Sequence, residues 1–182
     1  MKFTKGYWMN LPGVTNTDAV QVREVKVEND RVYLYTVPYH ADMRAMGGPL
    51  LEMYISSPQP DIIRTEAYHF MGGNQKMPAF ELNDAHCALE VENTETTVTI
   101  KSGNTKLVIG KNPCSFDYYY KDKKLTSIGN RFGNAMISTI STPDGNYMRA
   151  QMNLDIGEKV YDLGERFTPY VKNGQTVETW NE

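Results

Sequence analysis

Four glutamates near the end of the sequence have the side chains that could most directly carry out a reaction: Glu158, Glu165, Glu178 and Glu182. Two carboxyl groups about 5 Å apart can act as nucleophile and as general acid and base in a hydrolysis. Their spacing along the chain does not by itself bring any two together, and solvated or structural carboxylates are the commoner use of such residues. Glu165 differs, because it directly follows Gly164 and could hold a loop through Arg166 or through backbone amides.

Other motifs for catalysis or ligand binding are incomplete. His40, His69 and His86 form no pair at helical spacing, and no Cys-x-x-Cys accompanies them, so we expect no metal site. No serine lies within a Gly-x-Ser-x-Gly motif. The glycine-rich stretch 129–133 is not followed by the helix that a phosphate-binding loop requires, and we interpret it as an irregular turn.

The composition limits the partners that the chain can have. It carries 19 Lys and Arg against 22 Asp and Glu, a net charge of −3, with no basic cluster that could follow a phosphate backbone, so nucleic acid is not expected. No apolar run approaches the roughly 20 residues that cross a bilayer, and residues 1–10 lack the apolar centre of a secretory signal. These features predict a cytoplasmic protein with no membrane partner, in which Cys87 and Cys114 are free thiols.

Short β-prone runs separated by turns fill the first half of the chain. The valines of 19–28 change parity, which predicts a β-bulge near Arg23-Glu24. Asn29-Asp30 predicts a hairpin turn into 32–37, whose apolar residues on both faces predict a central strand. The stretches 38–49 and 72–84 are expected to be loops.

A meander of strands and turns is predicted for the second half, with the turn spacing of sandwiches and barrels. The clearest alternation predicts one buried face made of Met148, Ala150, Met152, Leu154 and Ile156. No window has a convincing helical repeat. The sequence therefore predicts an all-β fold of two packed antiparallel sheets with little helix.

Aromatic residues are concentrated at Tyr118-Tyr119-Tyr120 and at Tyr7-Trp8. Exposed aromatic rings on a β-sandwich can stack on sugar rings. Packing in the core or in an interface is the commoner use of such residues, because alternation buries every second residue of a half-buried strand.

The last stretch, 157–182, has apolar residues too sparse for a core strand. Val160-Tyr161 and Leu163 fit a short strand, Gly164 can supply a positive φ angle, and Asn173-Gly174 is a strong turn signal. These features predict a structured loop that follows a strand.

This stretch resembles the end of the N-terminal β-domain of glycoside hydrolase family 31, in which a Tyr-Gly-Leu-Gly-Glu signature precedes a loop over the catalytic barrel. The signature here reads Tyr161-Asp162-Leu163-Gly164-Glu165, and the continuation 171–181 is more similar to the α-xylosidase branch than to the α-glucosidase branch. Asp162 stands where the family usually has glycine. Because aspartate tolerates the left-handed backbone region better than most residues, the fold is expected to survive this change.

The resemblance implies an antiparallel β-sandwich of the galactose mutarotase-like supersandwich type over 1–182, with 157–182 as the start of a substrate-facing loop. The chain itself would be non-catalytic, since in this family both catalytic groups are aspartates on the following (β/α)8 barrel, which needs about 250 residues of its own. The parent would be a homo-oligomeric retaining α-xylosidase or α-glucosidase that uses no cofactor. The loop residues expected near its α-xyloside or α-glucoside substrate are Glu165, Arg166, Phe167, Trp180 and Asn181.

Two further interpretations stay open. The chain could be an independent carbohydrate-binding module, or an architectural domain that buries its faces against the barrel and against neighbouring subunits. Because 167–182 has few apolar anchors, we also expect this segment to depend on the barrel for its final shape.

Overall fold

The computed structural model describes residues 3–5, 9–38, 50–69, 85–129 and 137–179. The predicted loops 38–49 and 72–84 and the irregular turn 129–133 lie almost wholly outside these residues. The chain divides into two compact units. The sandwich unit is Gly13–Asn153, and the terminal unit combines Met1–Pro12 with Leu154–Glu182.

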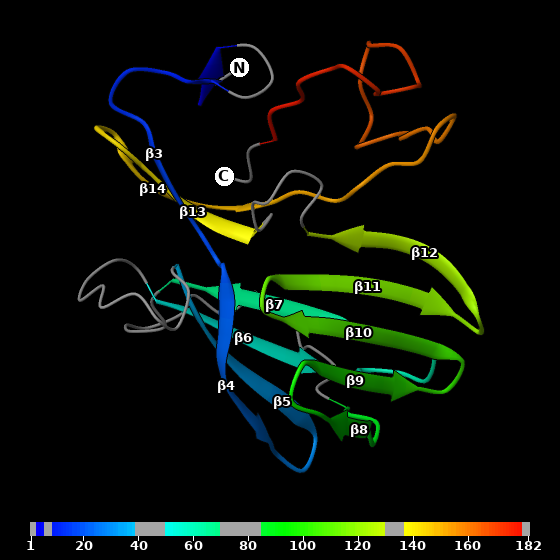
Figure 1. Cartoon of the computed structure of the whole chain (residues 1–182). Helices are drawn as coiled ribbons and strands as arrows, with labels where there is room; N and C mark the ends of the chain where they lie inside the picture. Colours follow the sequence, from blue (N-terminus) through cyan, green and yellow to red (C-terminus); the bar gives the residue numbers. More distant parts are fainter. Residues whose placement is uncertain (1–2, 6–8, 39–49, 70–84, 130–136, 180–182) are drawn as a thin grey trace. The chain divides into compact units, whose positions relative to one another are not determined.

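The sandwich unit contains three antiparallel sheets (Figure 1). The five-stranded sheet has the order β12-β11-β10-β9-β8, with β8 at Glu90–Asn93, β9 at Thr97–Ser102, β10 at Thr105–Lys111, β11 at Cys114–Tyr120 and β12 at Lys123–Ile128. The four-stranded sheet has the order β4-β5-β6-β7, with β4 at Gln21–Val27, β5 at Arg31–Val37, β6 at Leu51–Ser56 and β7 at Arg64–Tyr68. The third sheet has the order β14-β13-β3, with β3 at Thr15–Asp18, β13 at Ile137–Thr142 and β14 at Gly145–Ala150.

The terminal unit contains one two-stranded sheet, β1 (Thr4–Lys5) and β2 (Met9–Asn10). The all-β prediction is confirmed. Among the residues that the structure describes, no helix is long and apolar enough to cross a membrane.

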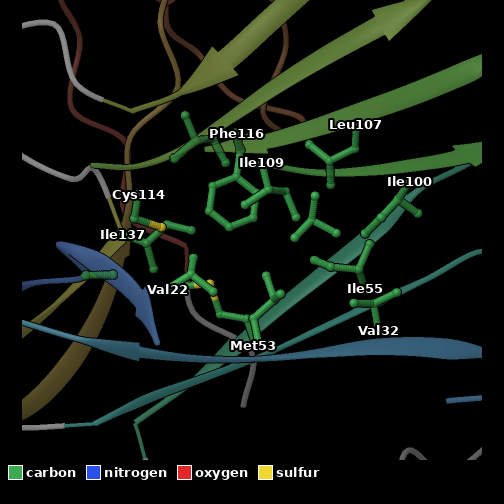
Figure 2. Close-up of a cluster of buried hydrophobic side chains, with 14 of the residues drawn as sticks. Val22, Val32, Met53, Ile55, Ile100, Leu107, Ile109, Cys114, Phe116 and Ile137 are labelled. Atoms are coloured by element: carbon green, nitrogen blue, oxygen red, sulfur yellow. The ribbon is translucent and has the colours of Figure 1, made fainter. Parts of the chain in front are cut away.

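The core of the sandwich unit lies between the four-stranded and five-stranded sheets, where apolar side chains from the two sheets meet (Figure 2). Alternate residues of β5 and β6 supply one side, and alternate residues of β9, β10 and β11 supply the other. Removing this apolar surface from water is the main term that stabilises the unit, at about 25 cal/mol per Å². The side chains that are almost fully buried include Leu34, Leu51, Met53, Ile55, Val98, Ile100, Leu107, Ile109 and Phe116.

The predicted bulge and hairpin are both present. The register of β4 against β5 shifts between Val22 and Glu24, so Val22 and Val25 can both pack at the core despite their different parity. The hairpin turns between β4 and β5, as the Asn29-Asp30 pair predicted, and β5 lies inside the sheet as expected.

The predicted buried face of 148–156 is wrong. Met148, Met152, Leu154 and Ile156 are exposed, whereas Tyr147 and Arg149 on the opposite face of β14 are half-buried. The regular strand ends at Ala150, and Met152 makes only an isolated bridge to Ile128. Alternation distinguishes the two faces of a strand, but it does not say which face is covered.

Strands β3 and β13 were not predicted, although β13 lies at the centre of its sheet. Its Ile-Ser-Thr-Ile run, Ile137 to Ile140, is buried throughout, which hides the alternation that marks a half-covered strand. The β-branched residues of 137–142 were the signal that could have identified it. Both cysteines are free thiols as predicted, with Cys114 in the core.

Candidate functional site

The signature stretch forms a left-handed turn in the terminal unit. Asp162, Leu163 and Gly164 have φ angles of 70°, 71° and 88°. Asp162 therefore adopts the left-handed region, which aspartate tolerates better than most residues. A left-handed leucine costs roughly 1 to 2 kcal/mol, so Leu163 is held there by its surroundings.

The chain on either side of the turn is tied together at Tyr161 and Val171. These two residues form an isolated β-bridge rather than the short strand that was predicted. The Asp162 amide donates to the Tyr170 carbonyl at 3.3 Å, and the Tyr161 and Tyr170 rings lie 5.3 Å apart. The turn and the following loop are therefore closed at their base.

Lys172 is the buried anchor of this loop, with only 6% of its surface exposed. Its ammonium donates to Thr168 Oγ1 and to the Pro169 carbonyl, both at 2.7 Å, and its backbone amide donates to the Val160 carbonyl at 2.8 Å. A buried ammonium is tolerated only when its hydrogens are bonded, so these contacts fix the loop around the lysine.

Asn173 joins the same loop to the preceding segment. Its side chain donates to the Glu158 carbonyl at 3.0 Å and accepts the Val160 amide at 2.9 Å. Gly174 has a φ angle of 75°, which confirms the predicted Asn-Gly turn. The sequence indicated this turn, but it gave no sign that Asn173 and Lys172 would anchor the loop through their side chains.

Arg166, rather than Glu165, supplies the long-range link within the predicted site. Its guanidinium donates to the Leu163 carbonyl at 3.1 Å and to Thr179 Oγ1 at 3.0 Å. Glu165 is exposed and forms no ion pair among the described residues. Trp180 and Asn181 lie outside the described residues.

Large apolar side chains face outward in the terminal unit. Phe167 and Ile156 are fully exposed, Tyr170 is mostly exposed, and Tyr161 and Leu163 are about half exposed. Exposed apolar groups gathered in one short segment are typical of a surface that binds another protein element or a ligand. The loop thus has a polar anchor and an apolar outer surface.

The sandwich unit has its own apolar hollow, of about 610 Å³. It lies between β7, β12 and β14, and the misassigned side chains Met148, Ala150 and Met152 line it together with Leu125 and Ile63. The apolar face of β14 therefore belongs to a concave surface rather than to the core.

Of the four glutamates near the end of the chain, the structure describes Glu158, Glu165 and Glu178, and Glu182 lies outside the described residues. Glu158 accepts the Asp155 amide at 2.8 Å, and Glu165 and Glu178 are exposed. Asp18 is paired with Arg149 at 3.1 Å, yet desolvation outweighs that attraction and raises the pKa of its carboxyl. Among the described residues, no His, Cys, Asp and Glu side chains form a group of three that could hold a metal ion.

The chain thus contains an antiparallel β-sandwich unit and a terminal unit whose anchored loop exposes aromatic side chains. Residues 52–182 match the family described as the glycosyl hydrolase 31 N-terminal galactose mutarotase-like domain. The chain belongs to this family, as the signature at 161–165 indicated.

Two curated relatives match the chain along its whole length. The α-xylosidase XylQ of Lactiplantibacillus pentosus is 30% identical over 189 residues, and an α-xylosidase of Emericella nidulans is 30% identical over 203 residues. Both alignments include 100% of this chain, but only 24% and 26% of the respective relatives. The chain therefore spans about a quarter of the length of the curated relatives that it matches.

Solved structures of larger proteins contain the same fold. The cycloalternan-forming enzyme of Listeria monocytogenes, in complex with a pentasaccharide substrate, aligns with a TM-score of 0.68 at 19% identity, over 96% of this chain and 15% of the enzyme. The Flavobacterium johnsoniae GH31 dextranase FjDex31A, complexed with glucose, aligns with a TM-score of 0.64 at 15% identity, over 87% of this chain and 18% of the dextranase. These similarities show the fold alone.

Proposed function

We propose that this domain belongs to a retaining α-glycosidase with α-xylosidase activity, and that its terminal unit docks on the catalytic barrel beside the substrate entrance. The observation that carries the proposal is the outward-facing Phe167 on a loop that Arg166 and Lys172 hold in place. An anchored loop loses less conformational entropy when it binds than an unanchored loop, which favours its use for positioning.

The choice of α-xylosidase is supported by the two 30% identical relatives of that name. The parent would act without a cofactor, as a cytoplasmic homo-oligomer. The two free thiols, Cys87 and Cys114, agree with a reducing compartment.

The loop can be tested in the full-length parent enzyme with Phe167→Ala. An aryl α-xyloside assay should show kcat/KM lower by about tenfold or more, because displacement of a positioning element costs up to about 100-fold. The matched control is Val27→Ala, which removes another exposed apolar side chain, on β4, and should leave kcat/KM unchanged. Equal activity of wild type and Phe167→Ala would contradict the docking loop, and turnover by the 182-residue chain alone would contradict its non-catalytic role.

An architectural role is a second candidate, and the hollow of the sandwich unit favours it. Met148, Ala150 and Met152 expose an apolar stripe that a neighbouring domain or subunit of the parent could cover. In the parent, Met152→Glu should then lower the Tm or the oligomer yield, whereas Val27→Glu on a separate exposed site should not. Identical behaviour of the two variants would exclude this use of the hollow.

A further inference from the structure

The outward surface of the four-stranded sheet carries a cluster of tyrosines, named here the tyrosine face. It comprises Tyr33 and Tyr35 on β5, Tyr54 on β6 and Tyr68 on β7, together with Glu52 and Glu66. Tyr33 is the register partner of Tyr54, and Glu52 is the partner of both Tyr35 and Tyr68. The alternate residues of the same strands point into the core, so these side chains lie on the opposite side of the sheet.

The rings of the tyrosine face contact one another across the strands. The Tyr33 and Tyr54 centroids are 5.3 Å apart with a tilt of 55°, and the Tyr54 and Tyr68 centroids are 6.1 Å apart with a tilt of 70°. All four tyrosines are half-buried. A row of aromatic rings that is only partly covered offers apolar area at a small entropic cost, because a tyrosine has few rotatable bonds.

Two carboxylates fix the hydroxyl ends of these rings. Tyr33 Oη donates to Glu52 Oε1 at 2.9 Å, and Tyr68 Oη donates to Glu66 Oε1 at 2.8 Å. Burial of Tyr33 and its bond to Glu52 raise the pKa of its hydroxyl, and the bond to Glu66 raises that of Tyr68, so both remain donors. The described hydrogen bonds of these carboxylates end on Oε1, so Oε2 of each retains acceptor capacity.

The cations around the face are already paired within it. Lys26 lies 5.3 Å from the Tyr33 ring centre and 3.1 Å from a Glu24 oxygen. Arg31 lies 4.8 Å from the Tyr54 ring centre, and Arg64 donates to Glu66 Oε1 at 2.6 Å. The local charges therefore offset one another, which favours a neutral ligand over an anionic one.

We propose that the tyrosine face binds a neutral oligosaccharide chain. Because Lys26 and Arg31 lie over the Tyr33 and Tyr54 rings, the sugar packs on the parts of the tyrosine rings that these cations leave uncovered, and its hydroxyls donate to Oε2 of Glu52 and Glu66. A second copy of the chain is less favoured as the occupant. A two-fold contact held by ion pairs needs unpaired charges on each copy, and the charges of this face are already paired within it. The proposal goes beyond the docking function, since it uses strands β5 to β7 rather than the terminal loop.

Titration calorimetry of the 182-residue chain with isomaltotriose, and separately with isoprimeverose, tests the proposal. At least one of these sugars should bind with a Kd in the millimolar range or tighter. Tyr54→Ala should weaken that binding by about tenfold, as loss of a central aromatic contact typically does. Glu52→Gln preserves the shape of the face while weakening one acceptor, and it should weaken binding by about threefold or more.

The matched control is Tyr119→Ala on β11, which removes a tyrosine that also has a lysine, Lys106, over its ring at 4.8 Å. Circular dichroism checks that each variant is folded, and binding should survive in the control. Absence of saturable binding by wild type would overturn the proposal, as would equal losses in Tyr54→Ala and Tyr119→Ala. Sedimentation that reveals a dimer lost in Tyr54→Ala would instead assign the face to self-association. This test does not measure the activity of the parent enzyme. A negative result for sugar binding would therefore leave the proposed docking function unaffected.

Discussion

At the scale of single residues, Asp162 has an unfavourable backbone angle in the terminal unit. Its φ of 70° lies in the left-handed region, where glycine has no side chain to clash. Asp162→Gly should stabilise the closed loop, so the loop amides should exchange about two to five times more slowly, equivalent to roughly 0.5 to 1 kcal/mol. Asp162→Val should have the opposite effect, because β-branched residues avoid this region. The exchange rate of the Lys172 amide, which donates to the Val160 carbonyl, measures the stability of the closed loop in both variants.

Cys114 is expected to make stability depend on pH in the alkaline range. Burial raises the pKa of its thiol from an ordinary 9.0 to about 12. Above pH 9 the unfolded chain loses this proton while the folded chain retains it, so stability is fully present below pH 9 and falls as the pH rises towards 12. At pH 10 the loss from this residue is roughly 1 kcal/mol.

Urea unfolding of wild type and Cys114→Ala at pH 7 and pH 10 isolates this effect. The variant is destabilised at both pH values by the lost packing. The difference in unfolding free energy between wild type and variant should be about 1 kcal/mol smaller at pH 10, because only the wild type loses the contribution of the thiol. A gap of the same size at both pH values would mean that the thiol has no raised pKa.

At the scale of elements, the sequence predicted where the strands of the sandwich lie better than it predicted which of their faces are buried. The parity change in β4 predicted its bulge because that strand packs on a core supplied by its own unit. The equally clean alternation of 148–156 predicted a buried face, but Met148, Ala150 and Met152 line an open hollow instead of the core. Strand β13 was missed because Ile137 to Ile140 are buried on both faces and include serine and threonine as well as isoleucine, so no alternation marks the strand.

The contrast between Met53 and Met152 tests this reassignment. Met53 on β6 is 0% exposed in the core, whereas Met152 is 57% exposed. Met53→Ala should cost about 2 to 5 kcal/mol of unfolding free energy, since it leaves a cavity, but Met152→Ala should cost less than about 1 kcal/mol. Denaturant unfolding of the two variants gives both values. A loss above 2 kcal/mol for Met152→Ala would restore the original assignment of the face.

At the scale of the whole chain, the candidate site could be located from sequence but not built from it. The signature at 161–165 marked the loop, and its Asp162 adopts a left-handed angle that aspartate tolerates. The anchors could not be foreseen, because the burial of Lys172 depends on acceptors at Thr168 and Pro169 that only the folded loop brings together. Apolar periodicity carries no information about such polar contacts.

The two units differ in what holds them, and this leads to a prediction about their stabilities. The sandwich unit has a continuous apolar core, whereas the terminal unit relies on hydrogen bonds and exposes Phe167 and Tyr170. Polar contacts near water contribute only about 0.5 to 1.5 kcal/mol each, less than the backbone entropy of the residues that they order. The terminal unit should therefore open without unfolding the sandwich.

Amide exchange of the dilute 182-residue chain measures this difference directly. Protection at the Lys172 and Gln175 amides, both hydrogen-bonded, should be at least about 100-fold lower than at Ile55 and Ile100 in the core strands. Lys172→Met, which retains the length of the stem but loses both side-chain bonds, should reduce the remaining protection of the loop further and leave the core strands unchanged. Equal protection of loop and core in the wild type would show that the anchors alone hold the loop as firmly as the sandwich, with no contribution needed from a catalytic barrel.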